Sequence, residues 1–174
     1  MPFQPQSLGA AAILILAALI PGRAESQRRA PGPEWSLLIG AARYDLTSRG
    51  TGLAGHAGLA FRPVRRGLLL EPSLGYLTYR NRFGVRDHWF FPELSVQTEV
   101  RLGMLRPFVG GGGGAGVASL VGPDRWHGAL HGVTGVRLRL GRDWGGRAEV
   151  RFRAVPPWSG HTTDFGFGVI LGLF

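Results

Sequence analysis

The sequence contains no cysteine and no lysine. Without cysteine, the chain has neither a disulfide framework nor a thiolate metal site. Without lysine, it has no Gly-Lys phosphate loop, and all 20 of its basic residues are arginine. It also lacks the run of roughly 20 apolar residues that a membrane-spanning helix needs. What remains is a chain with a formal net charge of +9 and an unusually high glycine content, 29 of 174 residues.

One apolar stretch, residues 8–20, stands near the N-terminus and is too short to span a membrane as a helix. A small-residue site that ends at Ala24 follows, and polar sequence begins directly after it. This layout is typical of a secretory signal peptide. We therefore expect residues 1–24 to be removed on export, leaving a short polar leader at 25–33 and one domain at 34–174.

From residue 34 onward, apolar and polar residues alternate with a period of two, which favours strands over helices. In the segment 88–102, for example, Leu94 and Val96 share one face, while Glu93 and Gln97 share the other. The same pattern predicts eight strands, over residues 34–46, 51–62, 67–80, 88–102, 106–119, 126–140, 143–155 and 162–174.

The segments between these predicted strands differ in length. Tight connections are expected near 62–67, 102–106 and 140–143, and longer ones near 80–87, 120–125 and 155–162. The first connection of the chain, near 46–50, belongs with the longer set by position but is short. Alternating tight and longer connections are expected when one end of an up-and-down barrel faces the periplasm and the other faces outside.

The two faces of the predicted strands decide between a soluble sandwich and a membrane barrel. One face carries organised charge, whereas the other is apolar and free of charge along its middle. In lipid, every backbone group must be paired, so an exported β chain crosses a membrane only as a closed barrel. The predicted fold is therefore all-β, an eight-stranded antiparallel up-and-down transmembrane β-barrel in a bacterial outer membrane. A soluble periplasmic β-sandwich is the alternative fold.

Side chains fill the interior of a barrel of eight strands, and charges buried there must be paired. We predict an interior charge network of Glu71, Glu93, Gln97, Glu99, Arg101, Arg137, Arg139, Arg147, Glu149, Arg151 and Arg153. Removal of Glu99 or Glu149 should then destabilise the barrel by a few kcal/mol, because an arginine loses its partner. Two other interpretations of the acidic residues are general acid–base catalysis and an ion path.

The stretch LRPFVGGGGGAGVA, residues 105–118, and the later stretch GVTGVRLRLGRDWGGRAEVRFR, residues 132–153, resemble the outer-membrane protein A-like β-barrel domain family. Members commonly carry a Pro-aromatic-Val-Gly-x-Gly strand, a Gly-rich strand ending in Arg, a tight Asp turn and a strand with Arg-Ala-Glu. Here these features fall on Pro107, Phe108, Val109, Gly110 and Gly112, on Arg137 and Arg139, on Asp143, and on Arg147, Ala148 and Glu149. The resemblance implies the fold and leaves the activity open.

The final stretch, DFGFGVILGLF, ends on Phe174. A terminal aromatic on a last amphipathic strand resembles the signature of bacterial outer-membrane barrels. This resemblance implies that the barrel-assembly machinery recognises the last strand. In the alternation, however, Phe174 falls out of phase with the more apolar face of that strand.

The glycine run Gly110–Gly114 permits a phosphate-loop interpretation, because Gly111, Gly113 and Gly116 satisfy G-x-G-x-x-G. That fingerprint requires a helix after the glycines, and no helical period follows here. We therefore interpret residues 106–119 as a strand whose glycine face points inward, where it leaves room for long side chains from its neighbours.

The histidines offer two further hypotheses. His127 and His131 resemble a metal pair, but on a strand they lie about 13 Å apart, so we predict neither a metal nor a cofactor. The sequence His161-x-Thr163, followed by Asp164, resembles the His-x-Ser pair of lipid A deacylases, with threonine in place of serine. We predict no catalytic role and keep this acyl hydrolase as a minor alternative.

The arginines are dispersed rather than gathered in one patch, so we expect no nucleic-acid partner. Four of them, Arg80, Arg82, Arg86 and Arg125, fall at the predicted outer loops and suit the phosphates of lipopolysaccharide. We predict a monomeric barrel with outer-membrane lipids as partners, a structural or surface-binding role and limited passage of small solutes. The alternative function is a small channel or transporter for small or apolar solutes.

Overall fold

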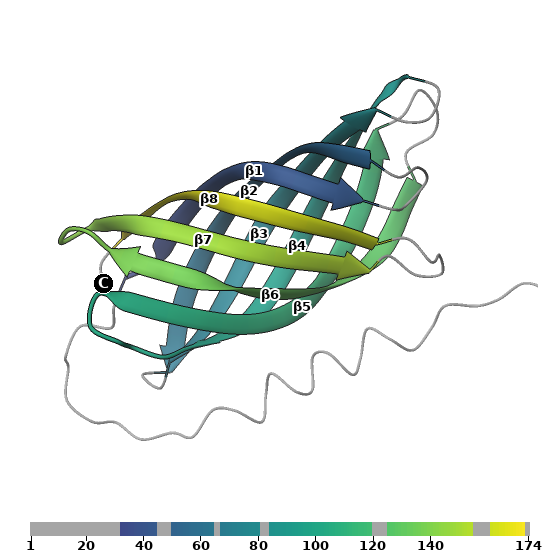
Figure 1. The fold of residues 1–174 in the computed structure, drawn as a ribbon. Coiled ribbons are helices and arrows are strands. Elements are labelled where there is room, and N and C mark those ends of the chain that lie inside the picture. The colour runs from purple at the N-terminus through teal and green to yellow at the C-terminus, as the bar shows by residue number, and fades with distance from the viewer. Residues whose placement is uncertain are drawn as a thin grey trace, which may run out of the picture. The chain divides into compact units, whose positions relative to one another are not determined.

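A computed structural model describes residues 32–44, 50–64, 67–80, 84–119, 125–154 and 161–172. They form β1 (Glu34–Tyr44), β2 (Gly50–Val64), β3 (Leu68–Arg80), β4 (Arg86–Glu99), β5 (Leu105–Ser119), β6 (Arg125–Arg139), β7 (Trp144–Ala154) and β8 (His161–Gly172). Each strand pairs antiparallel with its neighbours in sequence, and β1 also pairs with β8, so the sheet closes into a barrel (Figure 1). The predicted eight-stranded antiparallel barrel is confirmed.

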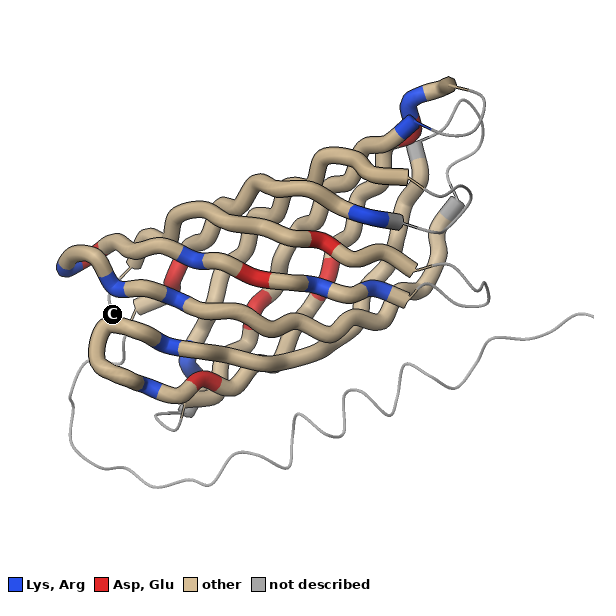
Figure 2. Tube along the Cα trace, viewed as in Figure 1, with Lys and Arg blue, Asp and Glu red and all other residues tan. Residues whose placement is uncertain are grey.

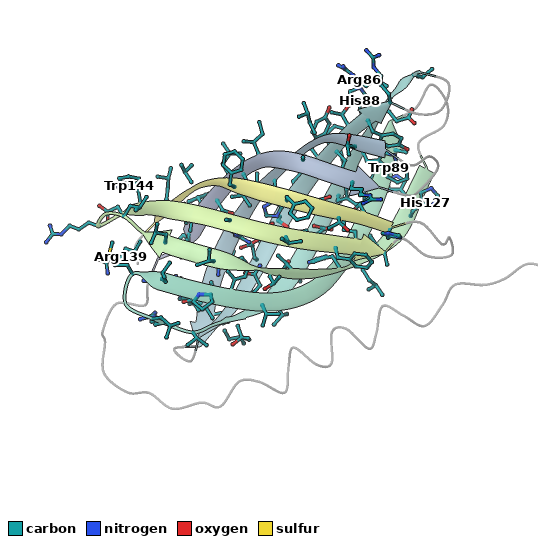
Figure 3. All side chains as sticks on the ribbon, viewed as in Figure 1. Arg86, His88, Trp89, His127, Arg139 and Trp144 are labelled. Carbon is teal, nitrogen blue, oxygen red and sulfur yellow. The ribbon has the colours of Figure 1, made fainter. Side chains whose placement is uncertain are left out.

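The barrel has two distinct ends. We call the end where β1 begins and β8 finishes the turn end, since the short β2–β3, β4–β5 and β6–β7 connections lie there. The opposite end, which carries the other four connections, is the loop end. In Figure 3, Arg139 and Trp144 mark the turn end, and Arg86, His88, Trp89 and His127 mark the loop end.

The exterior of the barrel is apolar because alternate side chains of a strand point to opposite faces. Every strand contributes at least one large apolar side chain to the exposed surface, as Trp35, Leu53, Leu74, Phe90, Val109, Leu130, Phe152 and Phe165 illustrate. Aromatic side chains stand near both ends of this surface, with Trp35 and Trp144 toward the turn end and Phe90, Trp126 and Phe152 toward the loop end. An apolar band between two aromatic girdles is the exterior expected of a barrel in lipid.

The β4–β5 turn shows how local sequence closes the hairpins. Leu102 and Leu105 exchange two backbone hydrogen bonds, of 2.8 and 3.1 Å, across a two-residue turn. Gly103, the first of those two residues, has φ of 64°. Side chains rarely tolerate this conformation, whereas glycine adopts it readily, so Gly103 sets the turn.

The glycine run lies in the middle of β5, as predicted. A Cβ atom added to Gly110 would meet Cγ of Gln97 at 2.7 Å, and one added to Gly112 would meet the His131 ring at 3.0 Å and collide with the Leu94 carbonyl. These glycines therefore face inward, and they let β5 approach β4 closely while leaving the interior to longer neighbouring side chains.

Several predictions from the sequence lie outside the described residues, namely the signal peptide, the leader up to residue 31, and Phe174. On β8, the apolar phase of Phe165, Phe167, Val169 and Leu171 points outward, as the alternation indicates. The described part of the chain contains no helix with the length and apolar character needed to cross a membrane.

Candidate functional site

Thirteen charged side chains of the described residues point into the barrel. Asp87 lies near the loop end of β4, and the other twelve form what we call the interior network. It contains six acids, Glu34, Glu71, Glu93, Glu99, Glu149 and Asp164, and six arginines, Arg62, Arg106, Arg137, Arg147, Arg151 and Arg153. All eight strands contribute, and acidic and basic positions interleave along the barrel wall in Figure 2. The network is formally neutral, so the other 14 arginines and five acids of the chain account for its entire charge of +9.

Glu93 is the centre of the layer nearest the loop end. One of its carboxylate oxygens accepts a hydrogen bond from Arg153 Nε at 2.6 Å, and the other accepts one from Arg151 Nη1 at 2.6 Å. Arg153 also pairs with Asp164 on β8. His131 Nδ1 lies 3.4 Å from Glu93, so four charged groups and an imidazole meet at this level.

Glu71 is the centre of the middle layer. Both of its oxygens accept hydrogen bonds from Arg147, at 2.6 and 2.9 Å, in the bidentate geometry that favours Arg–carboxylate pairs. Arg147 is also 2.5 Å from Glu149, which in turn lies 3.2 Å from Arg151. Glu149 and Arg151 therefore connect the middle layer to the one above it.

The third layer lies nearest the turn end. Glu34 on β1 pairs with Arg62 at 2.6 Å and with Arg137 at 3.1 Å. Glu99 makes only longer contacts, 3.4 Å to Arg62, 3.6 Å to Arg137 and 4.0 Å to Arg106 and to the exposed Arg101. Within this layer Glu34 is held as closely as the acids of the other layers, and Glu99 more loosely.

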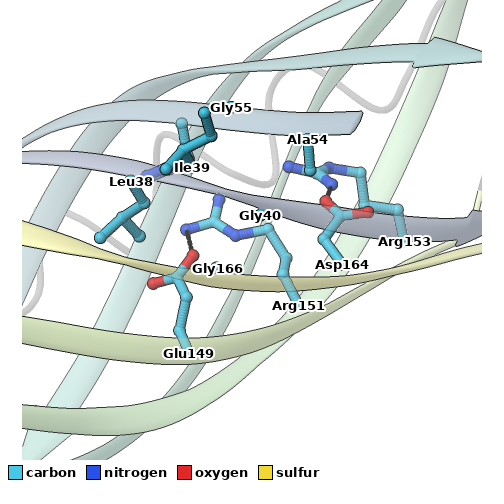
Figure 4. Close-up of a pocket in the computed structure, with 11 residues that line it drawn as sticks. Leu38, Ile39, Gly40, Ala54, Gly55, Glu149, Arg151, Arg153, Asp164 and Gly166 are labelled. Atoms are coloured by element: carbon cyan, nitrogen blue, oxygen red, sulfur yellow. Dashed lines mark ion pairs between the residues drawn. The ribbon is translucent and has the colours of Figure 1, made fainter. Parts of the chain in front are cut away.

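The network fills the lumen instead of lining a channel. The side chains of Arg137, Arg151 and Arg153 point inward and yet are at most 1% exposed. Inward side chains beside a water-filled pore would be exposed, so no such pore exists at these levels. The cavity shown in Figure 4, beside the Glu149–Arg151 pair, has a volume of about 10 Å³, which is room for one water molecule.

The loop-end half of the interior is mainly apolar, although Asp87 and Thr162 are also buried there. We call its apolar residues the loop-end cluster, which consists of Ala42, Ala54, Leu77, Tyr79, Trp89, Phe91, Ala118 and Ala129. Trp89 and Phe91 stack with ring centroids 5.9 Å apart, and His127 stacks on Trp89 at 6.0 Å. The Arg153 guanidinium lies 4.8 Å from the Phe91 ring centre, so a cation–π contact joins the cluster to the network.

The structure places nine of the eleven predicted network residues in the interior and two outside it. Arg101 lies two residues beyond the last residue of β4, and its side chain is 62% exposed. Arg139, the last residue of β6, is also exposed and donates to the Gly141 carbonyl at 3.2 Å. The prediction was wrong for both residues because the strands end at this level, where a long side chain reaches water.

Four members of the network were missed in the sequence, namely Glu34, Arg62, Arg106 and Asp164. Each lies in the inward phase of its strand and close to a strand end. Extending the alternation of β2 from His56 to Arg62, or that of β5 from Gly110 back to Arg106, would have found two of them. Asp164 shares the inward phase of β8 with Gly166 and Gly168, and because that phase contains mostly glycine, the alternation did not mark it as a charged face.

The predicted loop arginines are described only in part. Arg80 and Arg86 are exposed and are direct cross-strand partners at the loop end of β3 and β4. Arg82 and the side chain of Arg125 lie outside the described residues. Two like charges directly opposite each other are unfavourable on a sheet, so this pair suits an anion that lies between them.

Aromatic and polar side chains lie below this arginine pair on the same outer wall. The Tyr76 hydroxyl and His88 Nδ1 share a hydrogen bond of 2.6 Å, and the Tyr76 ring lies 5.2 Å from that of Phe90. A polar tip on an aromatic body suits the boundary between lipid tails and headgroups.

The structure does not assemble the deacylase arrangement around His161. His161 points outward and packs against Phe152, with ring centroids 5.5 Å apart. Asp164 points inward to Arg153, and Glu149 is likewise inside. Imidazole and carboxylate are therefore on opposite sides of the wall.

A different hydroxyl–imidazole–carboxylate series lies inside the barrel. Ser95 Oγ is 2.7 Å from His131 Nε2, and His131 Nδ1 is 3.4 Å from Glu93. Serine hydrolases use this order of groups. Here, however, Ser95 is 0% exposed and two arginines bind Glu93, so the series has a structural role. The described residues contain no group of three or more potential metal ligands.

Two solved structures of small barrels resemble this fold. The crystal structure of Neisserial surface protein A (NspA) superposes with a TM-score of 0.68 at 14% identity and covers 83% of this chain and 99% of that one. The N-terminal β-barrel domain of Pseudomonas aeruginosa OprF gives a TM-score of 0.53 at 14% identity, with 79% and 97% coverage. At this identity, the likeness shows the fold alone. No family model and no curated protein sequence matches the chain.

Proposed function

We propose that the protein is an exported, monomeric outer-membrane β-barrel of the outer-membrane protein A-like kind, with a structural and surface-binding role. The observation that carries this proposal is the contrast across one wall, which is apolar outside and ion-paired inside. Such a wall is stable only when lipid covers its exterior. The packed lumen favours this role over a channel or transporter, and the separation of His161 from Asp164 favours it over an acyl hydrolase.

Membrane fractionation and conductance test the membrane role together. The full chain should sediment with outer membranes, depend on detergent for solubility and migrate differently on gels before and after heating. In planar bilayers it should give no steady conductance, because side chains fill the lumen. A water-soluble protein, or a stable open channel, would contradict the proposal.

The partners we propose are outer-membrane lipids and, at the loop end, lipopolysaccharide. Arg80 and Arg86 would bind its phosphates, assisted by Arg82 and Arg125. We also propose that the barrel-assembly machinery recognises the last strand through Phe174 and that cleavage after Ala24 precedes assembly.

Binding of lipopolysaccharide to the detergent-solubilised protein tests the loop-end contact. Arg80→Gln together with Arg86→Gln should weaken binding about tenfold or more, since each charge-assisted hydrogen bond contributes about 1.5 kcal/mol or more. Arg142→Gln, which removes an exposed arginine at the turn end, serves as the matched control. Equal binding by the double variant and the control would remove this part of the proposal.

A further inference from the structure

The outer wall contains a groove where β6, β7, β8 and β1 lie side by side (Figure 1). Its volume is about 550 Å³, which falls within the range of roughly 300–1,000 Å³ that is usual for ligand sites. The outward side chains that line it are Ala41, Thr134, Val136, Ala148, Val150, Phe165 and Phe167. Glu149 also lines the groove, but its carboxylate is paired with Arg147 and Arg151 inside the barrel, and no arginine is among the lining residues.

The register of the four strands explains the hollow. Ala41, Phe165, Val150 and Thr134 form one row of cross-strand partners, and Ile39, Phe167, Ala148 and Val136 form the next row toward the turn end. The small side chains of Ala41, Thr134 and Ala148 lie beside the large rings of Phe165 and Phe167 or beside valines, which leaves a depression between them. The one hydroxyl in the rows, that of Thr134, donates to the Phe108 carbonyl at 3.2 Å, so the surface of the groove is apolar.

A cation stands at the loop-end rim of the groove. Arg43 is exposed and lies two residues beyond Ala41 on the same outward face, about 7 Å away. Its cross-strand partners are Thr51 on β2 and Thr163 on β8, so a guanidinium and two hydroxyls share one level of the wall. Thr163 is in turn the partner of Phe152 in the loop-end girdle. Among the described residues, no acid forms an ion pair with Arg43.

This arrangement defines the chemistry of its occupant. An apolar groove within the lipid-facing band, continuous with a cation and hydroxyls at the headgroup level, fits an acyl chain that leads to a phosphate. We propose that one lipid A moiety of lipopolysaccharide binds here, with an acyl chain in the groove and a phosphate on Arg43. The inference rests on the proposed function, which places the loop end in the leaflet that contains lipopolysaccharide.

Native mass spectrometry of the full chain in detergent, with bisphosphorylated lipid A as the probe, tests this site. Arg43→Gln should weaken lipid A binding about tenfold, the effect of one charge-assisted hydrogen bond. Ala148→Phe should weaken it as well, because the added ring occupies the place of the chain. In the double variant the losses should be less than additive, since one ligand connects both positions. Dephosphorylated lipid A should lose its dependence on Arg43 and keep its dependence on Ala148.

Two matched variants serve as controls. Ala57→Phe makes the same change on the outward face of β2, outside the groove, and Arg142→Gln removes a charge at the turn end. Both should bind lipid A as the wild type does, and heat-dependent gel mobility checks that every variant is folded.

Three results would overturn the inference. The first is that folded Ala148→Phe binds lipid A as tightly as the wild type, and the second is that the losses in the double variant are fully additive. The third is that the variants change the oligomeric state of the protein without losing lipid A, which would assign the groove to a second copy of the chain. Each of these leaves a barrel that still sediments with outer membranes. Failure of the proposed function itself would instead appear as failure to sediment with them.

Discussion

The half of the barrel interior nearer the turns is filled mainly by ion pairs, with a few apolar side chains such as Leu69, Phe108 and Ile170. The half nearer the loops is filled mainly by aromatic and small apolar side chains. Both halves exclude water, but they do so under different constraints. An apolar side chain in a packed core accepts many neighbours, so a similar shape can replace it at a small cost. A buried charge needs a partner of opposite sign at a particular place, so even a substitution that keeps its shape is disruptive.

The largest effect is expected for Glu93→Gln. Glutamine has nearly the same shape as glutamate, but the substitution leaves the buried Arg151 and Arg153 without their shared carboxylate. The free energy of unfolding should fall by about 4 kcal/mol, within the range for breaking a buried ion pair. Urea titration of the protein in lipid vesicles measures this quantity. A midpoint equal to that of the wild type would show that the ion pairs at this level are dispensable.

Phe91→Ala in the loop-end cluster should have a somewhat smaller effect. The Phe91 ring is fully buried against Trp89, and truncation leaves a cavity that costs about 3 kcal/mol. Phe91→Leu should cost only about 1 kcal/mol, because the apolar half tolerates a change of shape. The same titration compares the two variants. If Phe91→Leu were as damaging as Glu93→Gln, the two halves would not differ in tolerance.

Glu99→Gln should have a moderate effect, about 1 to 2 kcal/mol, as expected for a weakly paired polar group. Its contacts with Arg62, Arg137 and Arg106 are longer than those of Glu93 and lie near the open turn end. The difference between the unfolding midpoints of Glu99→Gln and Glu93→Gln is the decisive measurement. Equal shifts would mean that depth in the barrel does not set the strength of the network.

Arg101→Gln should have the smallest effect, below about 0.5 kcal/mol, because water screens the charge of a side chain that is 62% exposed. This variant separates the network as observed from the network predicted from the sequence. If the free energy of unfolding fell as much as in Glu99→Gln, Arg101 would contribute to the interior network despite its exposure.

The alternation of residue types was sufficient to predict the eight strands and the inward phase of residues such as Glu71 and Arg147. It was not sufficient to predict where a strand ends, so Arg101 and Arg139 were assigned to the interior and Arg62 was missed. The pairing itself also lay beyond the sequence. Glu71 and Arg147 are 76 residues apart, and they meet because of the strand registers and the reach of an arginine across the lumen.

The outer groove was hidden for a similar reason. Ala41, Ala148 and Thr134 are ordinary small residues in the sequence, and nothing local marks them as a site. They form a hollow only because the registers of β6, β7, β8 and β1 bring them into adjoining rows. A groove that depends on strand register can be identified only from the structure of the closed barrel.

The distribution of the network over all eight strands has a consequence for biogenesis. Arg147 contacts Ser36 across 111 residues of sequence, and Glu34 pairs with Arg137, so these contacts require β1 to have met the far side of the sheet. Because these partners lie on β1, β6 and β7, this part of the network is complete only when the β1–β8 seam has closed.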